Sequence, residues 1–484
     1  MRKVLLFCAW SLVFAQDRQA EVLAEFRDFV AIPNVAADKT DIERNAEAIR
    51  KMMERRGIHV KFLRTPDAPP VVYGEIAVAG AKRTLIFYAH YDGQPVDAKQ
   101  WAGGDPFRPV LRSAALEKDG RVLPWPRPGD KIDPEWRIYG RSSSDDKAPI
   151  IALMAALDRA KPTSNIKFFF EGEEEASSQH LEQIVRENAA LLAGDVWLIC
   201  DGPLSQNRQQ QIYFGARGVA GLDVTVYGAR RELHSGHYGN WAPNPAMMLA
   251  RLLASMKDDD GRVLVDGFYE GIVALSESER KALAGSPDID SELRRELWLA
   301  RTEGSGRKLN ELINEPSLNV RGLESVAVGK QARNVVPASA TASIDLRLVK
   351  GIDWHVQAER VIRHIEKQGY FVTKNEPDES MRRQHPKIAR VIVESGYNAV
   401  RTSMDLPISR DVVKAVEGVR GPVVLMPTLG GSVPLWVFEG VMKTPMIGVP
   451  IVNHDNNQHS FNENLRLQNL WDGIGTMEAL LTMR

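Results

Sequence analysis

The chain has 484 residues, of which 44% are hydrophobic and 26% are charged, and it contains 37 glycines and 27 prolines. This composition is typical of a folded globular protein and excludes the collagen-like, low-complexity and wholly disordered classes. Lys and Arg number 62 against 63 Asp and Glu, which gives a formal net charge of -1 without a dense basic run, so we expect no nucleic-acid partner. At about 100 to 200 residues per domain, the length predicts two or three domains.

The first segment, residues 1–16, has the pattern of an export signal. Arg2 and Lys3 precede an apolar stretch over residues 4–15, and the small residue Ala15 stands before Gln16, as in a cleavable secretory signal. We therefore expect a secreted or periplasmic protein after signal peptide removal. An uncleaved N-terminal helix of the core is the alternative. The stretch is shorter than the roughly 20 apolar residues that a membrane span needs, and we expect no membrane span.

Residues 17–214 alternate between helical and strand-like segments. Helical patterns cover residues 17–57 and 148–160. The predicted strands are short, apolar and rich in β-branched or aromatic residues, and they cover residues 60–63, 71–76, 84–88, 166–170 and 196–199. Such alternation predicts an α/β domain with a mostly parallel sheet and helices on both faces.

Residues 215–376 have a different pattern, which predicts an α+β domain inserted into the first. Alternating strands are expected around residues 222–226 and 340–348, and helices over 243–256 and 277–301. The first domain then resumes over residues 377–484, with predicted helices at 386–393 and 465–483 and a strand at 423–426. Residues 105–130, which contain a proline-rich core, are predicted to be an ordered loop.

Polar side chains follow two of the predicted strands. His90 and Asp92 come after the strand at 84–88, and Asp201 comes after the strand at 196–199. A spacing of two places His90 and Asp92 on the same side, so Asp92 can orient the imidazole for a metal. Taken alone, the pair is equally compatible with ordinary capping. Because open α/β sheets bind ligands at the carboxyl ends of their strands, we include Asp92 among the candidate catalytic residues.

Three further groups of polar residues carry chemistry that is ambiguous when each is taken alone. Asp145 and Asp146 precede a predicted helix, where carboxylates often act only as caps. The carboxylate run at residues 171–175, which includes Glu174 and Glu175, follows three phenylalanines of a buried strand, and cations would offset its repulsion. His459 lies in a polar loop near the end of the chain.

Together these residues have the composition of a site for two metal ions. Two divalent ions bridged by one carboxylate, each also held by one His and one carboxylate, use five ligands and leave one Glu free. This count predicts a two-metal hydrolase. Imidazole and carboxylate ligands without thiolate suit Zn²⁺, with Mn²⁺ or Co²⁺ as alternatives.

The motifs, in this order, resemble those of the M20 family of metallopeptidases, especially its dipeptidase branch of carnosinases and related aminoacyl-dipeptidases. The resemblance spans nearly the whole mature chain and rests on residues 88–95, 140–147, 171–175 and 459–463. It implies that Asp145 bridges the two ions and that Glu174 is the general base. It also implies the remaining ligands, with His90 and Asp201 on one ion and Glu175 and His459 on the other.

The inserted domain resembles the lid and dimerisation domain of the same family. Residues 233–239 are similar to the segment whose histidine, here His234, reaches the active site of a neighbouring subunit, which implies a homodimer. The segments around Asn334 and Arg347 resemble the part that binds the substrate's terminal carboxylate. The stretch 430–434, with Gly431 and Ser432, matches a substrate-binding loop.

Four positions depart from the family pattern. Glycine is usual where this chain has Ser142, Ala148 and Ser177, and an acidic residue is common where it has Leu429. The departures spare the expected ligands and base. They bear on substrate choice and on local backbone geometry, because a glycine position often marks a conformation that other residues adopt at a cost.

The resemblance implies a peptidase that cleaves dipeptides or short peptides with a free C-terminal carboxylate, and the pattern of residues 1–16 adds the expectation that it is exported. Metal-activated water would attack with Glu174 as base, His234 would donate to the developing oxyanion, and Arg347 would hold the carboxylate. An N-acyl or N-carbamoyl amino acid amidohydrolase on the same site is one alternative. A catalytically dead peptide-binding protein is another, from a different class.

Overall fold

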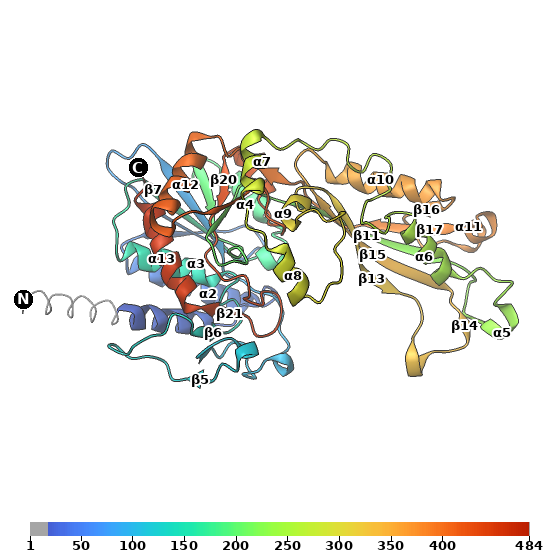
Figure 1. Ribbon diagram of the computed structural model, residues 1–484, viewed down its shortest axis with the longest axis horizontal. Coiled ribbons are helices and arrows are strands. Elements are labelled where there is room, and N and C mark those ends of the chain that lie inside the picture. The colour runs from blue at the N-terminus through green and yellow to red at the C-terminus, as the bar shows by residue number, and fades with distance from the viewer. Residues whose placement is uncertain (1–17, 484) are drawn as a thin grey trace, which may run out of the picture.

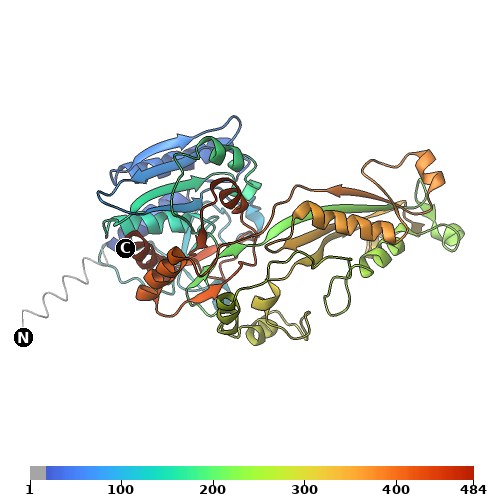
Figure 2. The same ribbon diagram turned by 90° about the horizontal axis from the view of Figure 1, so that it is seen from above.

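The computed structural model describes residues 18–483. It consists of a larger α/β domain and a narrow, elongated domain that extends from one side of it (Figures 1 and 2). The predicted signal peptide, residues 1–16, lies outside the described residues. Among the described helices, none is both long and apolar enough to cross a membrane.

An eight-stranded sheet forms the centre of the larger domain, in the order β1-β2-β7-β3-β8-β20-β9-β19. The strands around β3 are parallel, namely β3 with β7, β3 with β8, and β8 with β20, and β9 pairs with β19 in the same way. The remaining neighbours are antiparallel. The bounds are β1 (His59–Leu63), β2 (Val71–Ile76), β3 (Thr84–His90), β7 (Asn165–Glu171), β8 (Val196–Ile199), β9 (Gln211–Tyr213), β19 (Val424–Met426) and β20 (Met446–Gly448).

Helices cover both faces of this sheet, which explains why its central strands are apolar throughout. Phe87 and Phe168 pack into the core under one set of helices, whereas Tyr88 and Phe169 face the core on the other side. The first face carries helix 18–30, α2 (Lys39–Glu54), α3 (Lys147–Leu157), α12 (Pro407–Arg420) and α13 (Leu467–Leu481), and the second carries α4 (Leu181–Glu187) and the turn η5 (Phe438–Met442). These features confirm the predicted α/β class.

The elongated domain is built on a five-stranded sheet in the order β13-β15-β11-β17-β16. One face packs against α6 and α10, because alternate residues of β11 and β15 are apolar and buried; the opposite face carries polar residues such as Arg347 and Asp345. The bounds are β11 (Gly218–Tyr227), β13 (Ser317–Glu324), β15 (Ser339–Leu348), β16 (Phe371–Thr373), β17 (Ile388–Val393), α6 (Pro245–Ala254) and α10 (Trp354–Lys367).

Short elements complete both domains. A small sheet in the order β21-β6-β4-β5 lies in the larger domain, while α7, α8 and α9 lie in the segment between the two domains (Figure 1). The bounds are β4 (Val110–Arg112), β5 (Val122–Leu123), β6 (Arg137–Tyr139), β10 (Gly215–Ala216), β12 (Leu233–His234), β14 (Val335–Val336), β18 (Val400–Arg401), β21 (Asn464–Arg466), α5 (Ser235–Tyr238), α7 (Glu277–Ala284), α8 (Asp290–Glu296), α9 (Leu309–Leu312) and α11 (Glu379–Gln384).

Two predicted elements are wrong. The helix predicted over residues 386–393 is strand β17, which pairs with β11, because a short apolar run fits either structure and this one is rich in β-branched residues. The sheet of the inserted domain therefore continues beyond residue 376, where we predicted that domain to end. The loop predicted over residues 105–130 contains β4 and β5, which pair with each other.

Two of the four departures from the family pattern lie in left-handed backbone. Ser142 has a φ of 60° and Ser177 a φ of 70°, a conformation that costs a residue with a Cβ roughly 1 to 2 kcal/mol. The serines therefore occupy positions whose geometry favours glycine. The Ser142 hydroxyl accepts a hydrogen bond from Asn34 Nδ2 at 2.9 Å, which offsets part of this cost.

We expect Ser177→Gly to raise the free energy of unfolding by about 0.5 to 1 kcal/mol, because it removes left-handed strain at an exposed position. Urea denaturation measures this change. The control is Ser380→Gly in α11, which should lower stability because glycine weakens a helix. A lower stability for Ser177→Gly would contradict the strain argument.

Candidate metal centre

Five side chains converge at the carboxyl ends of the central strands, in two groups that share one carboxylate. The ligand atoms in each group lie within 4.8 Å of one another. His90, Asp145 and Asp201 form the first group, and Asp145, Glu175 and His459 form the second. The structure thus brings together all five predicted ligands and places Asp145 in both groups.

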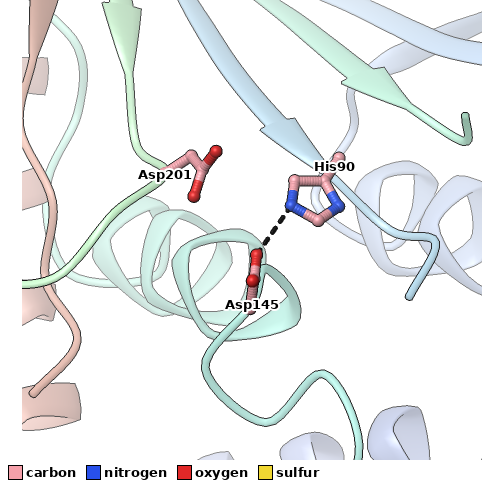
Figure 3. A group of neighbouring side chains, drawn as sticks. All are labelled: His90, Asp145 and Asp201. Atoms are coloured by element: carbon pink, nitrogen blue, oxygen red, sulfur yellow. Dashed lines mark hydrogen bonds and ion pairs between the residues drawn. The ribbon is translucent and has the colours of Figure 1, made fainter. Parts of the chain in front are cut away.

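The first group lies where two parallel strands end. His90 is the last residue of β3, and Asp201 follows β8, the neighbouring strand. Asp145 comes from the loop that leads into α3, and its Oδ1 lies 2.9 Å from His90 Nε2 (Figure 3). All three residues are buried. The chain order therefore places these side chains at one edge of the sheet, as expected for an open α/β sheet.

The second group joins a carboxylate after β7 to a loop near the C-terminus. His459 Nε2 lies 3.0 Å from Asp145 Oδ2 and 3.4 Å from Glu175 Oε2. Gln94 Nε2 donates to Glu175 Oε2 at 2.7 Å. Gln94 lies in the His90 motif, but no role was predicted for it, because its contact depends on how two loops fold together.

Asp92 is buried beneath the centre and contacts both halves of it. Its Oδ1 lies 3.3 Å from His90 Nδ1, which leaves Nε2 of His90 for a metal ion. The backbone N–H groups of Glu174 and Glu175 donate to the same carboxylate at 3.1 and 2.9 Å. Asp92 therefore orients His90. It also holds the short helix η3 (Glu174–Ala176), which carries Glu174 and Glu175.

The electrostatics of the centre fit bound cations. Burial raises the pKa of Glu175 to about 8 and that of Asp201 to about 6, and the nearby charge of Asp145 adds to both shifts. Burial also raises the pKa of Glu174 well above its usual value, with a further contribution from Asp201. Burial opposes ionisation of Asp145, but hydrogen bonds from His459 and His90 hold its pKa below the usual range. Divalent cations would offset this crowding of carboxylates, and the imidazole and carboxylate ligands suit Zn²⁺, Mn²⁺ or Co²⁺.

The loop that carries Asp145 is held in place by Glu463, a residue that the sequence placed in the His459 motif without a role. The Glu463 carboxylate is fully buried. Its Oε1 accepts from the N–H groups of Ser144 and Asp145 at 2.9 and 3.0 Å. Its Oε2 accepts from the N–H of Ser142 at 2.9 Å and from Arg141 Nη1 at 2.8 Å. Because His459 and Glu463 belong to one loop, this contact joins that loop to the shared ligand.

We expect Glu463→Gln to weaken metal binding by about 10- to 100-fold, as is typical when a group that orients metal ligands is changed. The amide nitrogen of glutamine would face N–H donors that now meet a carboxylate oxygen. Titration of the metal-loaded protein with a competing chelator measures the affinity. The control is Glu478→Gln on α13. Glu478 lies at the surface, where its ion pair with Arg159, at 3.6 Å, is long and exposed. Equal affinities for the two variants would contradict the role of Glu463.

A pocket of about 510 Å³ lies beside the metal centre. Asp145, Glu174, Asp201 and His459 line one side of it, and the double-glycine loop with Ser432 lines another. Arg347, from the inserted sheet, donates through Nη1 to Ser432 Oγ at 2.7 Å and through Nε to Asp345 Oδ2 at 3.0 Å. Leu309 and Ile313, at either end of α9, also line the pocket, although no sequence motif indicated them.

Two predicted site residues do not reach the metal centre of their own chain. His234 and Asn334 are exposed and lie beside α5 and β14, at the end of the elongated domain remote from the larger domain (Figure 1). His234 Nδ1 accepts a hydrogen bond from the Gly236 N–H at 3.1 Å. A neutral His234 ring therefore carries its proton on Nε2, which makes that atom a donor.

An α/β sheet that presents two carboxylate-bridged groups of metal ligands beside a substrate-sized pocket defines a metal-dependent hydrolase. The model of peptidase family M20/M25/M40 matches residues 86–483, and the chain belongs to this family. The sequence-based predictions of a metal-dependent hydrolase and of its family are thereby confirmed.

The chain is similar over most of its length to two dipeptidases and to one solved M20 family structure. It is 26% identical over 481 residues to a Cys-Gly metallodipeptidase of Schizosaccharomyces pombe, covering 94% of each chain. It is 28% identical over 428 residues to the human β-Ala-His dipeptidase, covering 85% of this chain and 76% of the relative. The crystal structure of an M20 family metallo-carboxypeptidase from Sulfolobus solfataricus aligns with a TM-score of 0.76 at 26% identity, covering 96% of this chain and 99% of that chain.

Proposed function

We propose that the protein is a two-metal peptidase that cleaves dipeptides or short peptides with a free C-terminal carboxylate. The observation that carries the proposal is the sharing of Asp145 by two metal-binding groups in a pocket that also presents Arg347. The names of the two dipeptidase relatives support a dipeptide substrate. We propose Zn²⁺ as the ion, with Mn²⁺ or Co²⁺ as alternatives, because the ligands are imidazoles and carboxylates.

Glu174 is the residue we assign to proton transfer. When bound, the two ions supply Lewis acidity that makes a water molecule and the scissile carbonyl more reactive. Glu174 lines the pocket but belongs to neither metal group, so its carboxylate is available to accept a proton from the attacking water and deliver it to the leaving amine. The raised pKa of Glu174, which burial causes, favours its protonated form after the first transfer.

Arg347 is the residue we assign to the C-terminal carboxylate. Its guanidinium is fixed by Asp345 and Ser432, and a planar guanidinium can bind a carboxylate through two parallel hydrogen bonds. Ser432 and Gly431 line the same part of the pocket and would contact the substrate there. This arrangement favours substrates with a free C-terminal carboxylate over those in which it is blocked.

We propose a homodimer in which His234 of the partner subunit completes each active site. In this arrangement Nε2 of the partner's His234 donates a hydrogen bond to the developing oxyanion, and the partner's Asn334 lies beside it. The exposure of both residues, their distance along the elongated domain from their own metal centre (Figure 1), and the proton on Nε2 support this assignment.

The substrate is tested by comparing dipeptides, dipeptide amides, N-acetyl amino acids and N-carbamoyl amino acids, each with and without chelator. We expect chelator-sensitive cleavage of the dipeptides and much slower cleavage of the other substrates. Faster cleavage of the N-acyl or N-carbamoyl compounds would replace the proposal with an amidohydrolase function. Binding of dipeptides without any turnover by the metal-loaded protein would favour the dead-site alternative.

We also propose that the protein is exported, on the strength of the charged and then apolar order of residues 1–16. N-terminal sequencing of the protein purified from its natural source should begin near Gln16. A first residue of Met1 or Arg2 would contradict cleavage of a signal peptide.

A further inference from the structure

A second arginine, Arg217, lies near Arg347, just before the neighbouring strand β11. It takes no part in the chemistry described above. It connects β10 to β11, and its side chain is buried. Arg347 pairs across the sheet with Val219 on one side and with Ser317 on the other. Arg217 Nη2 donates to Ser317 Oγ at 3.0 Å and to the Glu315 carbonyl at 2.7 Å. The Arg217 guanidinium therefore binds Ser317, the residue that pairs with Arg347 on the neighbouring strand.

Arg217 also contacts the loop on the other side of Arg347. Its backbone N–H donates to the Gly431 carbonyl at 3.2 Å. The next residue, Ser432, accepts the hydrogen bond from Arg347 Nη1. Arg217 thus contacts both segments that flank the guanidinium of Arg347.

The charges in this region do not balance. Asp345 pairs with Arg347 at 3.0 Å, and that pair alone would be neutral. Within residues 18–483, no carboxylate forms an ion pair with Arg217, and its Nε is buried without a hydrogen-bond partner. Burial and the charge of Arg347 lower the pKa of Arg217 to about 10, so it stays protonated at neutral pH. Arg217 is buried and Arg347 is half-buried. These two cations beside the single carboxylate of Asp345 leave a local positive charge, which an anion would neutralise.

We propose that Arg217 is a specificity-determining residue that acts through this charge, so that the pocket favours substrates with a free carboxylate over uncharged analogues. Arg347 makes the direct contact with the substrate's carboxylate. Asp345 neutralises the charge of Arg347, and Arg217 supplies the positive charge that remains. The inference rests on the proposed function, because it assumes that the substrate's carboxylate binds at Arg347.

The test compares a dipeptide with its C-terminal amide, which lacks the negative charge. Arg217→Met should raise KM for the dipeptide by about 10- to 100-fold with little change in kcat, because charge interactions of 1.4 kcal/mol or more are expected at this depth. Cleavage of the amide should change by less than about threefold. Arg217→Lys, which keeps the charge, should retain most of the preference for the dipeptide. Inhibition by a free amino acid product and by its amide gives the same comparison where the amide is cleaved too slowly.

Arg401→Met is the matched control. Arg401 is also buried, and it donates to the Val273 and Ala274 carbonyls at 3.0 Å each and pairs with Glu279 at 3.1 Å. Its loss should lower stability without changing the ratio of dipeptide to amide cleavage. If Arg217→Met does not fold, Arg217→Gln, which also removes the charge but keeps a donor for Ser317 and the Glu315 carbonyl, should show the same selective change.

Equal losses on the dipeptide and the amide in Arg217→Met would overturn the inference, and so would a preference unchanged from the unsubstituted protein. Failure of the unsubstituted protein to cleave any dipeptide would instead overturn the proposed function. The two failures are distinguishable, because the second is seen before any variant is made.

Discussion

Glu174→Gln is expected to lower kcat by about 10²- to 10⁴-fold while the metal content stays the same. Glutamine keeps the shape of the side chain but cannot accept the proton of the attacking water. Glu174 contributes to neither metal group, so both groups retain their ligands. Steady-state kinetics and elemental analysis of the same preparation measure the two quantities together.

The control for this substitution is Glu173→Gln, one residue earlier. Glu173 faces His180, whose Nδ1 lies 2.9 Å from Glu173 Oε1, and it does not line the pocket. We expect its kcat to stay within about threefold of that of the unsubstituted protein, as for other changes that leave the reacting groups in place. Full activity of Glu174→Gln would contradict the assignment of the base.

His234→Ala is expected to lower kcat by about 10²- to 10³-fold, the usual effect of removing one donor to an oxyanion. Metal binding should not change, because His234 lies at the far end of the elongated domain. The control is His237→Ala on the same exposed turn, whose ring centroid lies 4.6 Å from that of His234. Equal activity of His234→Ala and the unsubstituted protein would contradict the role of His234.

A mixing experiment tests whether His234 acts across subunits. Glu174→Gln and His234→Ala chains are each inactive alone, but a mixed dimer would contain one site with both residues intact. After free exchange, half of the dimers are mixed and each has one working site, so activity should recover to about one quarter of the original. No recovery, despite proven exchange of subunits, would show that His234 acts within its own chain or not at all.

Three of the five proposed ligands were predictable from their positions in the sequence. His90 is the last residue of a strand with a clear apolar pattern, and Asp201 and Glu175 each follow such a strand. Parallel strands bring these ends together. Asp145 and His459 lie in loops, and their family motifs indicated them. The Asp92 contact followed from strand periodicity, which fixes the side to which alternate residues point.

The supporting contacts were not predictable, for a physical reason. Glu463 accepts hydrogen bonds from backbone N–H groups, and any residue type offers those groups. Arg217 contacts Ser317 and a carbonyl about 100 residues away in the sequence, and no local pattern marks such a pair. The strand β17 was missed because a run of six residues, five of them apolar, fits a helix or a strand until a partner strand is known.

The most direct test of the shared metal centre is the metal content of the zinc-loaded protein and of Asp145→Asn, measured by elemental analysis after removal of free metal. Because Asp145 belongs to both groups, we predict about two ions per chain in the unsubstituted protein and the loss of both in Asp145→Asn. Less than one ion per chain in the unsubstituted protein, or two ions retained by Asp145→Asn, would contradict a centre in which Asp145 bridges two metal ions.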